Sequence, residues 1–243
     1  MIKRLLDIIL SSIGLLCLLP LLLLIFFLIW KYDKKSPFYI APRVGKDGKI
    51  FKMLKLRSMI ANADSTGVAS TGNHDLRITP IGQKIRKFKL DELMQLWNVL
   101  KGDISLVGPR PNVKTETDLY TDVERELLSV KPGITDFSSI VFADEGKILE
   151  GKIDPDLAYN QLIRPWKSRL GLIYIQQQSI LLDLELIICT LISIFSRSKA
   201  LHWVSKKLDK LGVEKNLVDI AKRKVELVPH PPPGTDKIVG IIN

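Results

Sequence analysis

The chain has 243 residues, of which 46% are hydrophobic, so it can build one domain with appendages and is too apolar for general disorder. Its formal net charge is +10, with the basic excess in residues 1–60 and 196–243 and a slight acidic excess between them. This placement favours an anionic membrane surface and argues against a nucleic-acid groove, because aromatic residues are only 7% and do not alternate with the basic ones.

The cysteines and histidines exclude two further classes. Cys17 and Cys189 both lie inside apolar runs, which predicts a reducing compartment and no disulfide framework. The three histidines are far apart and lack the spacing of metal ligands, so no zinc site is expected.

The first predicted element is an uncharged segment, residues 8–30. As a helix it would be roughly 35 Å long at about 1.5 Å per residue, enough to cross a hydrocarbon core of about 30 Å. It is long for a secretory signal, and no small-residue cleavage pattern follows. A single-pass anchor and a helix that enters and leaves on one side both remain open.

Pro20 lies near the middle of this segment, where its missing backbone donor predicts a kink. Both flanks are basic, which would place both in the cytoplasm by the positive-inside rule. The residues alone favour neither the spanning nor the re-entrant form. The flanking basic residues are Lys3, Arg4, Lys31, Lys34 and Lys35.

A β-hairpin follows, because Asp47-Gly48 is a strong turn signal between two short apolar-rich runs. Alternation along its second strand places Lys55 and Arg57 on one face. That face is either solvated or a phosphate clamp. Residues 61–79, rich in small polar residues, predict a mobile loop that becomes ordered around a ligand.

The stretch from Lys84 to Pro111 carries the candidate chemistry. Asp91 and Glu92 open an apolar-periodic run predicted to be a helix to Leu100, and they lie between a basic run and a proline-braced Arg110. A carboxylate can attack phosphorus and form an acyl phosphate, and a neighbouring carboxylate can hold Mg²⁺. Ordinary helix capping and a rigid Gly-Pro-Arg-Pro turn are the alternative explanations.

Two segments complete the chain. Residues 180–195 are apolar but carry Asp183 and Glu185, so we expect a helix at the membrane interface or against the core. Beyond residue 196 we expect a basic tail with one amphipathic helical stretch, residues 213–227, before a proline-rich end.

The central motifs closely resemble those of the bacterial sugar transferases, the monotopic polyprenol-phosphate phosphoglycosyl transferases. They are LDEL (residues 90–93), QLWNVLKGDIS (95–105) and LVGPRP (106–111). The resemblance covers roughly residues 1–195. Supporting matches lie at residues 43–51, 55–59, 131–135 and 181–184.

For the fold, the resemblance implies a mainly helical α+β protein with a small β-hairpin and amphipathic interfacial helices. Residues 1–35 would form a re-entrant membrane helix broken at Pro20. Residues 36–195 would be the catalytic domain on the cytoplasmic face of the bacterial inner membrane, and residues 196–243 the basic tail.

For the function, the resemblance implies transfer of a sugar 1-phosphate from a UDP-sugar to polyprenol phosphate, usually undecaprenyl phosphate, with release of UMP. This would be the first membrane step of glycoconjugate assembly, by a ping-pong mechanism. Asp91 would be the nucleophile, and Glu92 with Asp91 would hold Mg²⁺. Matching phosphate-binding positions are Lys55, Arg57, Arg86 and Arg110.

Membrane lipids are further expected partners, nucleic acid is not, and a homo-oligomer is left open. Two alternatives remain: a non-enzymatic basic scaffold at the membrane surface, and an inactive relative that keeps the motif. They differ from the transferase in predicting no turnover of UDP-sugars.

One segment departs from the family pattern. After Thr135 many members continue with Gly-Trp-Ala-Gln-Val-Asn-Gly-Arg, whereas this chain continues with DFSSIVFADE (residues 136–145). The difference suggests a subgroup with its own donor preference, to which Arg164 and Lys167 would contribute.

Overall fold

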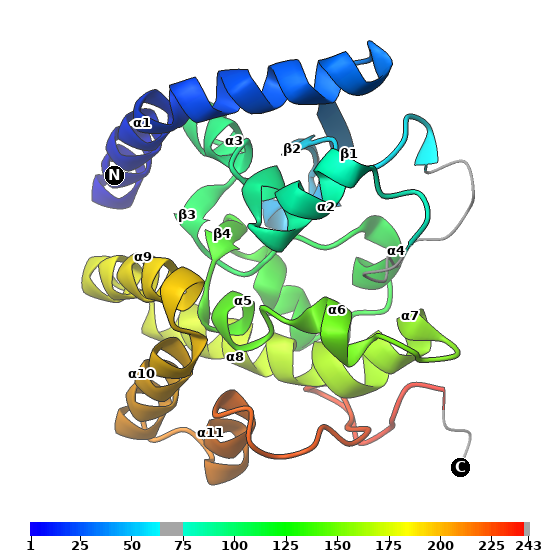
Figure 1. The fold of residues 1–243 in the computed structure, drawn as a ribbon. Coiled ribbons are helices and arrows are strands. Elements are labelled where there is room, and N and C mark those ends of the chain that lie inside the picture. The colour runs from blue at the N-terminus through cyan, green and yellow to red at the C-terminus, as the bar shows by residue number, and fades with distance from the viewer. Residues whose placement is uncertain (64–74, 241–243) are drawn as a thin grey trace.

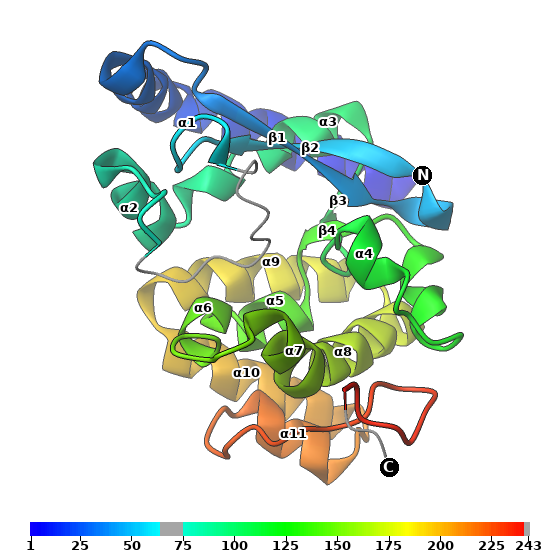
Figure 2. The ribbon, with the colours of Figure 1, turned by 90° about the vertical axis from the view of Figure 1, so that its right-hand side faces the viewer.

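The computed structural model describes residues 1–63 and 75–240. A long helix, α1, lies across the top of the molecule, with the β-hairpin and two short helices beneath it (Figure 1). Helices from the second half of the chain form the lower part, seen from the side in Figure 2. The middle of the predicted loop at residues 61–79 lies outside the described residues.

Helix α1 (Ile2–Asp33) contains Pro20 and is one continuous helix that changes direction along its length (Figure 1). The helix runs through Pro20 without interruption, where a break was predicted. The helix is long and apolar enough to cross a membrane, and only 17% of its most apolar part is buried in the protein. Such a small buried share is unlike that of a core helix in a soluble protein.

Both ends of α1 are attached to the same body. Near the N-terminal end, the Asp7 carboxylate accepts a hydrogen bond of 2.9 Å from the backbone N–H of Leu106. At the C-terminal end, the Arg57 guanidinium binds both oxygens of Asp33, at 2.5 and 2.7 Å. Lys3 and Arg4 add further hydrogen bonds to residues of the body.

The hairpin has the predicted turn. Strands β1 (Phe38–Val44) and β2 (Ile50–Leu56) pair in antiparallel register, with Val44 opposite Ile50. Asp47 and Gly48 have φ angles of 56° and 74°, so both are in the left-handed region that a tight turn of this kind requires. Beneath α1, a small core joins Leu22, Ile25, Ile29, Leu56, Ile85 and Met94.

Two short strands, β3 (Ser105–Val107) and β4 (Gly133–Thr135), pair in parallel beneath the hairpin. Their backbones approach so closely that a Cβ at Gly133 would lie 2.1 Å from the nitrogen of Gly108. Only glycine fits there. This contact fixes the start of the Gly-Pro-Arg-Pro turn, and so the base from which Arg110 extends.

The remaining elements are mostly short helices and helical turns. In the first half they are η1 (Lys46–Gly48), α2 (Pro80–Lys87), η3 (Leu90–Glu92), α3 (Gln95–Lys101), α4 (Lys114–Thr117) and η4 (Glu124–Leu128). In the second half they are α5 (Phe137–Val141), α6 (Glu145–Ile148), α7 (Pro155–Ala158), the π-helical turn η5 (Tyr159–Ile163), α8 (Arg164–Gln177), α9 (Ile180–Phe195), α10 (Arg197–Lys210) and α11 (Lys215–Ala221).

Residues 196–240 are part of the folded domain, which corrects the prediction of a separate basic tail beginning at residue 196. Ala200, Val204 and Leu208 of α10 have no exposed surface and join the largest hydrophobic core, together with side chains of α5, α8 and α9. Because these residues recur at every fourth position, they form one buried helix face. The many lysines of the segment occupy the other faces and hid this pattern.

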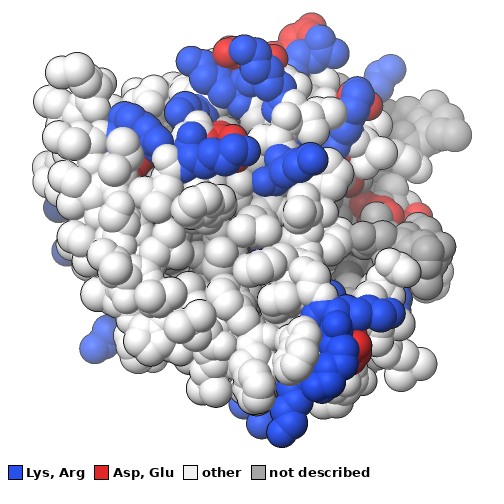
Figure 3. All heavy atoms as spheres, turned by 90° about the horizontal axis from the view of Figure 1, so that it is seen from above, with Lys and Arg blue, Asp and Glu red and all other residues white. Residues whose placement is uncertain are grey.

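The outer surface of the molecule keeps a large apolar area. Helix α9 buries Leu186 on one face and exposes Leu181, Ile188 and Phe195 on the other, so it contacts the core and still has an apolar outer face. Along α1 most leucines after residue 15 are also exposed. Figure 3, which views α1 from above, shows a broad uncharged face with Lys and Arg gathered at its edges.

Candidate active site

Asp91 and Glu92 lie on η3, a single helical turn beneath the hairpin. The preceding residue, Lys89, has a left-handed backbone with φ 53°, which redirects the chain after α2. Helix α3 begins only at Gln95, so the predicted helix from Asp91 starts four residues late. The two carboxylates are therefore outside the first turn of an α-helix, so the alternative explanation of ordinary helix capping does not apply to them.

Asp91 is a half-buried carboxylate without a hydrogen-bond partner. Within residues 1–63 and 75–240, no group donates a hydrogen bond to it. Burial raises its pKa above the usual 3.8, and the charge of Glu92 adds to the effect; the cations Lys55, Arg110 and Arg86 oppose it without outweighing it. The three cations can bind the anionic groups of a substrate, while the unpaired carboxylate stays free to react with it.

Glu92, the next residue, is hydrogen-bonded, in contrast to Asp91. Both terminal nitrogens of Arg110 donate hydrogen bonds to its carboxylate, one of them at 3.3 Å. Burial alone would raise the pKa of Glu92, but the charge and hydrogen bonds of Arg110 lower it to about 2. The same pair raises the pKa of Arg110. The environment thus separates two adjacent carboxyl groups that would titrate together in solution.

Lys55 and Arg86 approach Asp91 from two other elements. Lys55 extends from β2, and burial, followed by the charge of Arg110, lowers its pKa. Arg86 extends from α2, where its Nε donates a hydrogen bond of 2.9 Å to the Ser58 hydroxyl, and burial lowers its pKa also. The structure therefore brings together five of the six residues predicted from the sequence: Lys55, Arg86, Asp91, Glu92 and Arg110.

Arg57 is the exception. Its guanidinium is buried and binds Asp33, and its Nε donates a hydrogen bond of 2.7 Å to the Ser36 carbonyl. Alternation predicted that Arg57 would share a face with Lys55, but β2 ends at Leu56, so the chain leaves the sheet before Arg57. Arg57 attaches the end of α1 to the hairpin, and the structure does not place it at the carboxylates.

Three further residues belong to the same charged surroundings. Lys89 interacts with Glu92, Arg110 and Asp91 through its charge. On the other side of Arg110, Glu145 of α6 interacts with Arg110 and accepts a hydrogen bond of 2.5 Å from Lys167. Lys89 belongs to the basic run noted before the carboxylates but was not among the predicted phosphate-binding residues, and Glu145, in the divergent segment, was not predicted as a site residue.

Arg164 lies in a buried ion pair within the fold, whereas Lys167 belongs to the charged surroundings of Arg110. The Arg164 side chain is only 2% exposed and pairs with Glu124, which is fully buried. It also donates a hydrogen bond of 3.0 Å to the amide oxygen of Asn160. Its suggested contribution to donor preference is therefore not supported by its position, because none of its donors faces the carboxylate site.

Comparison with known proteins agrees with the motif. The model of the bacterial sugar transferase family matches residues 1–197. The chain belongs to the bacterial sugar transferase family. It is 36% identical over 68% of its length to an Aeromonas hydrophila UDP-N-acetylgalactosamine-undecaprenyl-phosphate N-acetylgalactosaminephosphotransferase, and 35% identical over 82% to a Klebsiella pneumoniae UDP-glucose:undecaprenyl-phosphate glucose-1-phosphate transferase.

A Bacillus subtilis putative undecaprenyl-phosphate N-acetylgalactosaminyl 1-phosphate transferase is 44% identical over 49% of this chain. The chain spans 40% and 41% of the length of the Aeromonas and Klebsiella relatives and 66% of the Bacillus one. The shared part includes the carboxylate site of this sugar transferase, since the family model covers every residue named at it so far.

The two carboxylates of this sugar transferase suit a magnesium ion that substrate phosphates and water also bind. They suit an ion enclosed by protein ligands alone less well. No cluster of three or more His, Cys, Asp or Glu side chains occurs in the described part of the chain. Mg²⁺ commonly needs only one or two carboxylates when substrate phosphates and water complete its shell. Asp91 has both oxygens without a donor, and Glu92 keeps lone pairs beyond those used by Arg110, so the pair fits that arrangement.

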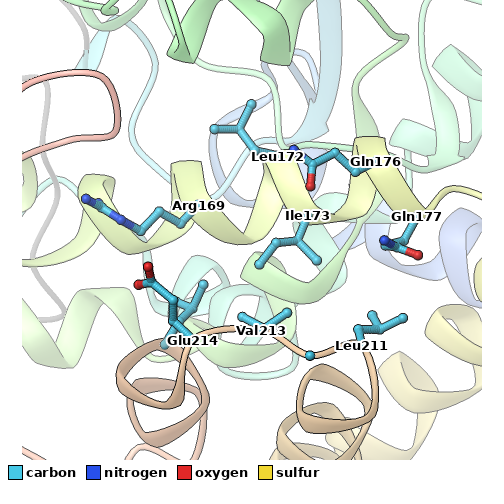
Figure 4. A pocket seen from close by; sticks show the side chains of 10 residues that line it. Arg169, Leu172, Ile173, Gln176, Gln177, Leu211, Val213 and Glu214 are labelled. Carbon is cyan, nitrogen blue, oxygen red and sulfur yellow. The ribbon is translucent and has the colours of Figure 1, made fainter.

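A cavity of about 350 Å³ lies away from the carboxylates of this sugar transferase, between α8 and the turn that joins α10 to α11 (Figure 4). Arg169 and Gln176 line it from α8, and Glu214 and Leu217 from the other side. It includes none of the residues around Asp91, so its volume gives no information about the carboxylate site.

Proposed function

We propose that the chain transfers a sugar 1-phosphate from a UDP-sugar to a polyprenol phosphate and releases UMP. The observation that carries the proposal is the contrast at Asp91 and Glu92: one carboxylate is unpaired among three cations, and its neighbour is bound by Arg110. A site built only for stability would pair both carboxylates. The relatives named above act on UDP-sugars and undecaprenyl phosphate, which supports these substrate classes.

In the first half-reaction, an oxygen of the Asp91 carboxylate attacks the β-phosphorus of the UDP-sugar. The bond between that phosphorus and the bridging oxygen breaks, and UMP leaves with the electron pair. In the second, a phosphate oxygen of the polyprenol phosphate attacks the same phosphorus. The acyl phosphate bond breaks, Asp91 is regenerated and the polyprenyl diphosphosugar is released.

The chain's residues have separate roles in these steps. Lys55, Arg86 and Arg110 neutralise the phosphates that must approach an anionic nucleophile. The raised pKa of Asp91 makes its carboxylate more basic, and hence a stronger nucleophile once ionised. When bound by Asp91 and Glu92, Mg²⁺ supplies further positive charge to the donor phosphates.

The attachment of α1 supports a membrane topology with both ends on one side. A helix that crossed the bilayer would carry its two ends to opposite faces, yet Asp7 and Asp33 both bind the same body. We therefore infer that α1 enters and leaves the lipid on one side. Its basic flanks support a cytoplasmic location of that side, and the exposed apolar face of α9 supports a position of this helix at the membrane interface.

The test is UMP release by the full chain in lipid nanodiscs, with UDP-sugars as donors and polyprenol phosphate as acceptor. We expect release with at least one donor, and a loss of at least about a thousandfold in Asp91→Asn, as for removal of other covalent nucleophiles. Asp122→Asn, at a fully exposed position, is the matched control.

Full turnover by Asp91→Asn would refute the covalent mechanism. Absence of UMP release with every donor would refute the transferase. The non-enzymatic scaffold predicts that second result, together with membrane binding that is the same in the wild type and in Asp91→Asn.

A further inference from the structure

Arg110 has a carboxylate on each of two sides. Glu92 accepts its hydrogen bonds, and the charge of Glu145 acts on it from α6. Glu145 also accepts a hydrogen bond of 2.5 Å from Lys167, so charges alternate from Glu92 through Arg110 and Glu145 to Lys167. The array leads away from Asp91 into the second half of the molecule.

The far end of this array is accessible and polar. The Glu145 side chain is 38% exposed, so it is partly accessible to a ligand. Arg110 and Lys167 line a hollow of about 20 Å³ with Asn112, Tyr159 and Arg164, and Glu145 lies outside this lining. The Lys167 ammonium also lies 5.4 Å from the centre of the Tyr159 ring. Hydrogen-bond donors and acceptors therefore converge beyond the arginine.

The sign of the charges limits what can bind there. Burial would raise the pKa of Glu145, but the charge and hydrogen bond of Lys167 and the charges of Arg110 and Lys89 together lower it, so this carboxylate is ionised at neutral pH. An ionised carboxylate repels phosphate, whereas the cations beside Asp91 attract it. A donor bound with its phosphates at Lys55 and Arg86 consequently directs an uncharged part of itself towards Glu145. In a UDP-sugar whose β-phosphate faces Asp91, a hydroxyl-rich sugar is such a part.

We propose that Glu145 and Lys167 bind hydroxyl groups of the donor sugar and determine which UDP-sugar this chain uses. The proposal rests on the transferase function proposed above. A carboxylate accepts hydrogen bonds from hydroxyls and an ammonium donates them, so an adjacent pair can distinguish the orientation of neighbouring hydroxyls. Such contacts discriminate strongly, because a wrong epimer leaves a charged group without its partner.

The pair is held in place by the C-terminal segment. Asp144, the residue before Glu145, accepts a hydrogen bond of 2.5 Å from Arg197 and lies 3.5 Å from the guanidinium of Arg223. Arg223 follows α11 and lies beyond residue 197, where the family match ends. Helix α6 has no side-chain cap of its own, so these arginines act as positioning residues for Glu145.

The experiment compares Glu145→Gln and Lys167→Gln with Lys147→Gln, an exposed position on the same short helix. UMP release gives kcat and KM for UDP-glucose, UDP-galactose and UDP-N-acetylgalactosamine, and calorimetry gives the affinity for UDP alone. We expect a roughly tenfold higher KM for the preferred donor and a smaller difference among donors, as for loss of one hydrogen bond to a charged group. UDP affinity and the control should not change.

A second set of variants tests the same idea through Arg223. Arg223→Gln should raise KM for the UDP-sugar and leave UDP affinity unchanged, and Arg223→Lys should restore part of the loss. A merely structural role would lower thermal stability without changing the ranking of donors.

The outcomes separate the two proposals. If the wild type releases UMP and both Gln variants keep its KM values and donor ranking, the sugar subsite is refuted and the transferase remains. If the variants weaken UDP and UDP-sugar equally, the pair does not contact the sugar and the subsite is refuted as well. If the wild type releases no UMP, the transferase is refuted and the subsite with it.

Discussion

Two charged clusters in this protein use the same residue types in opposite ways. Around Glu124, Arg164 donates from two nitrogens and Ser168 donates at 2.7 Å, and all three side chains are buried. Around Asp91, three cations gather, and none of them donates a hydrogen bond to its carboxylate within the described residues. Complete pairing identifies a group that stabilises the fold, and an accessible unpaired group identifies one that remains free for a substrate.

The largest expected effect is the difference in the free energy of unfolding between two variants, each of which removes a carboxylate charge from one of the clusters. Glu124→Gln leaves a buried arginine without its counter-charge and should lower the free energy of unfolding by about 3–5 kcal/mol. Asp91→Asn should raise it slightly, because a carboxyl with a raised pKa destabilises the fold once it ionises. Chemical unfolding in detergent measures both. A destabilised Asp91→Asn variant would contradict the contrast.

The next effect concerns the C-terminal helices. Leu208→Ala removes a fully buried side chain from the main core and should cost about 2–5 kcal/mol of stability. Leu211→Ala, at a partly buried position just after α10, is the matched control with a smaller cost. Equal and small costs at both positions would mean that residues 196–243 are a detachable tail after all.

A smaller effect separates the two arginines that the sequence analysis grouped together. Arg57→Gln should reduce stability by about 1–3 kcal/mol, through the lost contacts with Asp33, and leave the KM for donor unchanged in the folded fraction. Arg86→Gln should raise that KM with little change in stability. Thermal unfolding and UMP release assays distinguish them, and the reverse pattern would restore Arg57 as a phosphate ligand.

The smallest effect is in the pH dependence of turnover. The folded pKa of Asp91 is raised, so the nucleophile ionises only above the usual carboxyl pKa of 3.8, and activity should increase with pH through that higher value. Glu92, with a pKa of about 2, stays ionised throughout. At low pH, the logarithm of the turnover rate should therefore rise with pH with a slope of one, because only one group loses a proton. A limb with slope two, or with a midpoint below 3.8, would contradict these environments.

Local sequence signals predicted part of this structure and site. Asp47-Gly48 placed the hairpin turn because two left-handed residues in succession need those residue types. The motif at residues 90–111 placed Asp91, Glu92 and Arg110 together because the chain between them is short. The apolar composition of residues 180–195 also predicted a helix there, and α9 has one apolar face buried in the core and another that is exposed.

What the sequence could not show depends on contacts between distant residues. Arg57 leaves the strand pattern because β2 ends one residue earlier, which alternation does not reveal. Glu145 and Arg110 interact although they are far apart in the sequence, and the Asp144 contacts join residues more than 50 positions apart. In residues 196–243 the spacing of Ala200, Val204 and Leu208 was a usable signal, but net charge dominated the interpretation.

The most direct test of the central claim is a search for the covalent intermediate. The full chain is incubated with its UDP-sugar and Mg²⁺ without polyprenol phosphate, quenched, digested and analysed by mass spectrometry. The account predicts one sugar phosphate per chain on the peptide containing Asp91, with an equal amount of UMP, both absent in Asp91→Asn. UMP formed only when both substrates are present, with Asp91 unmodified, would contradict it.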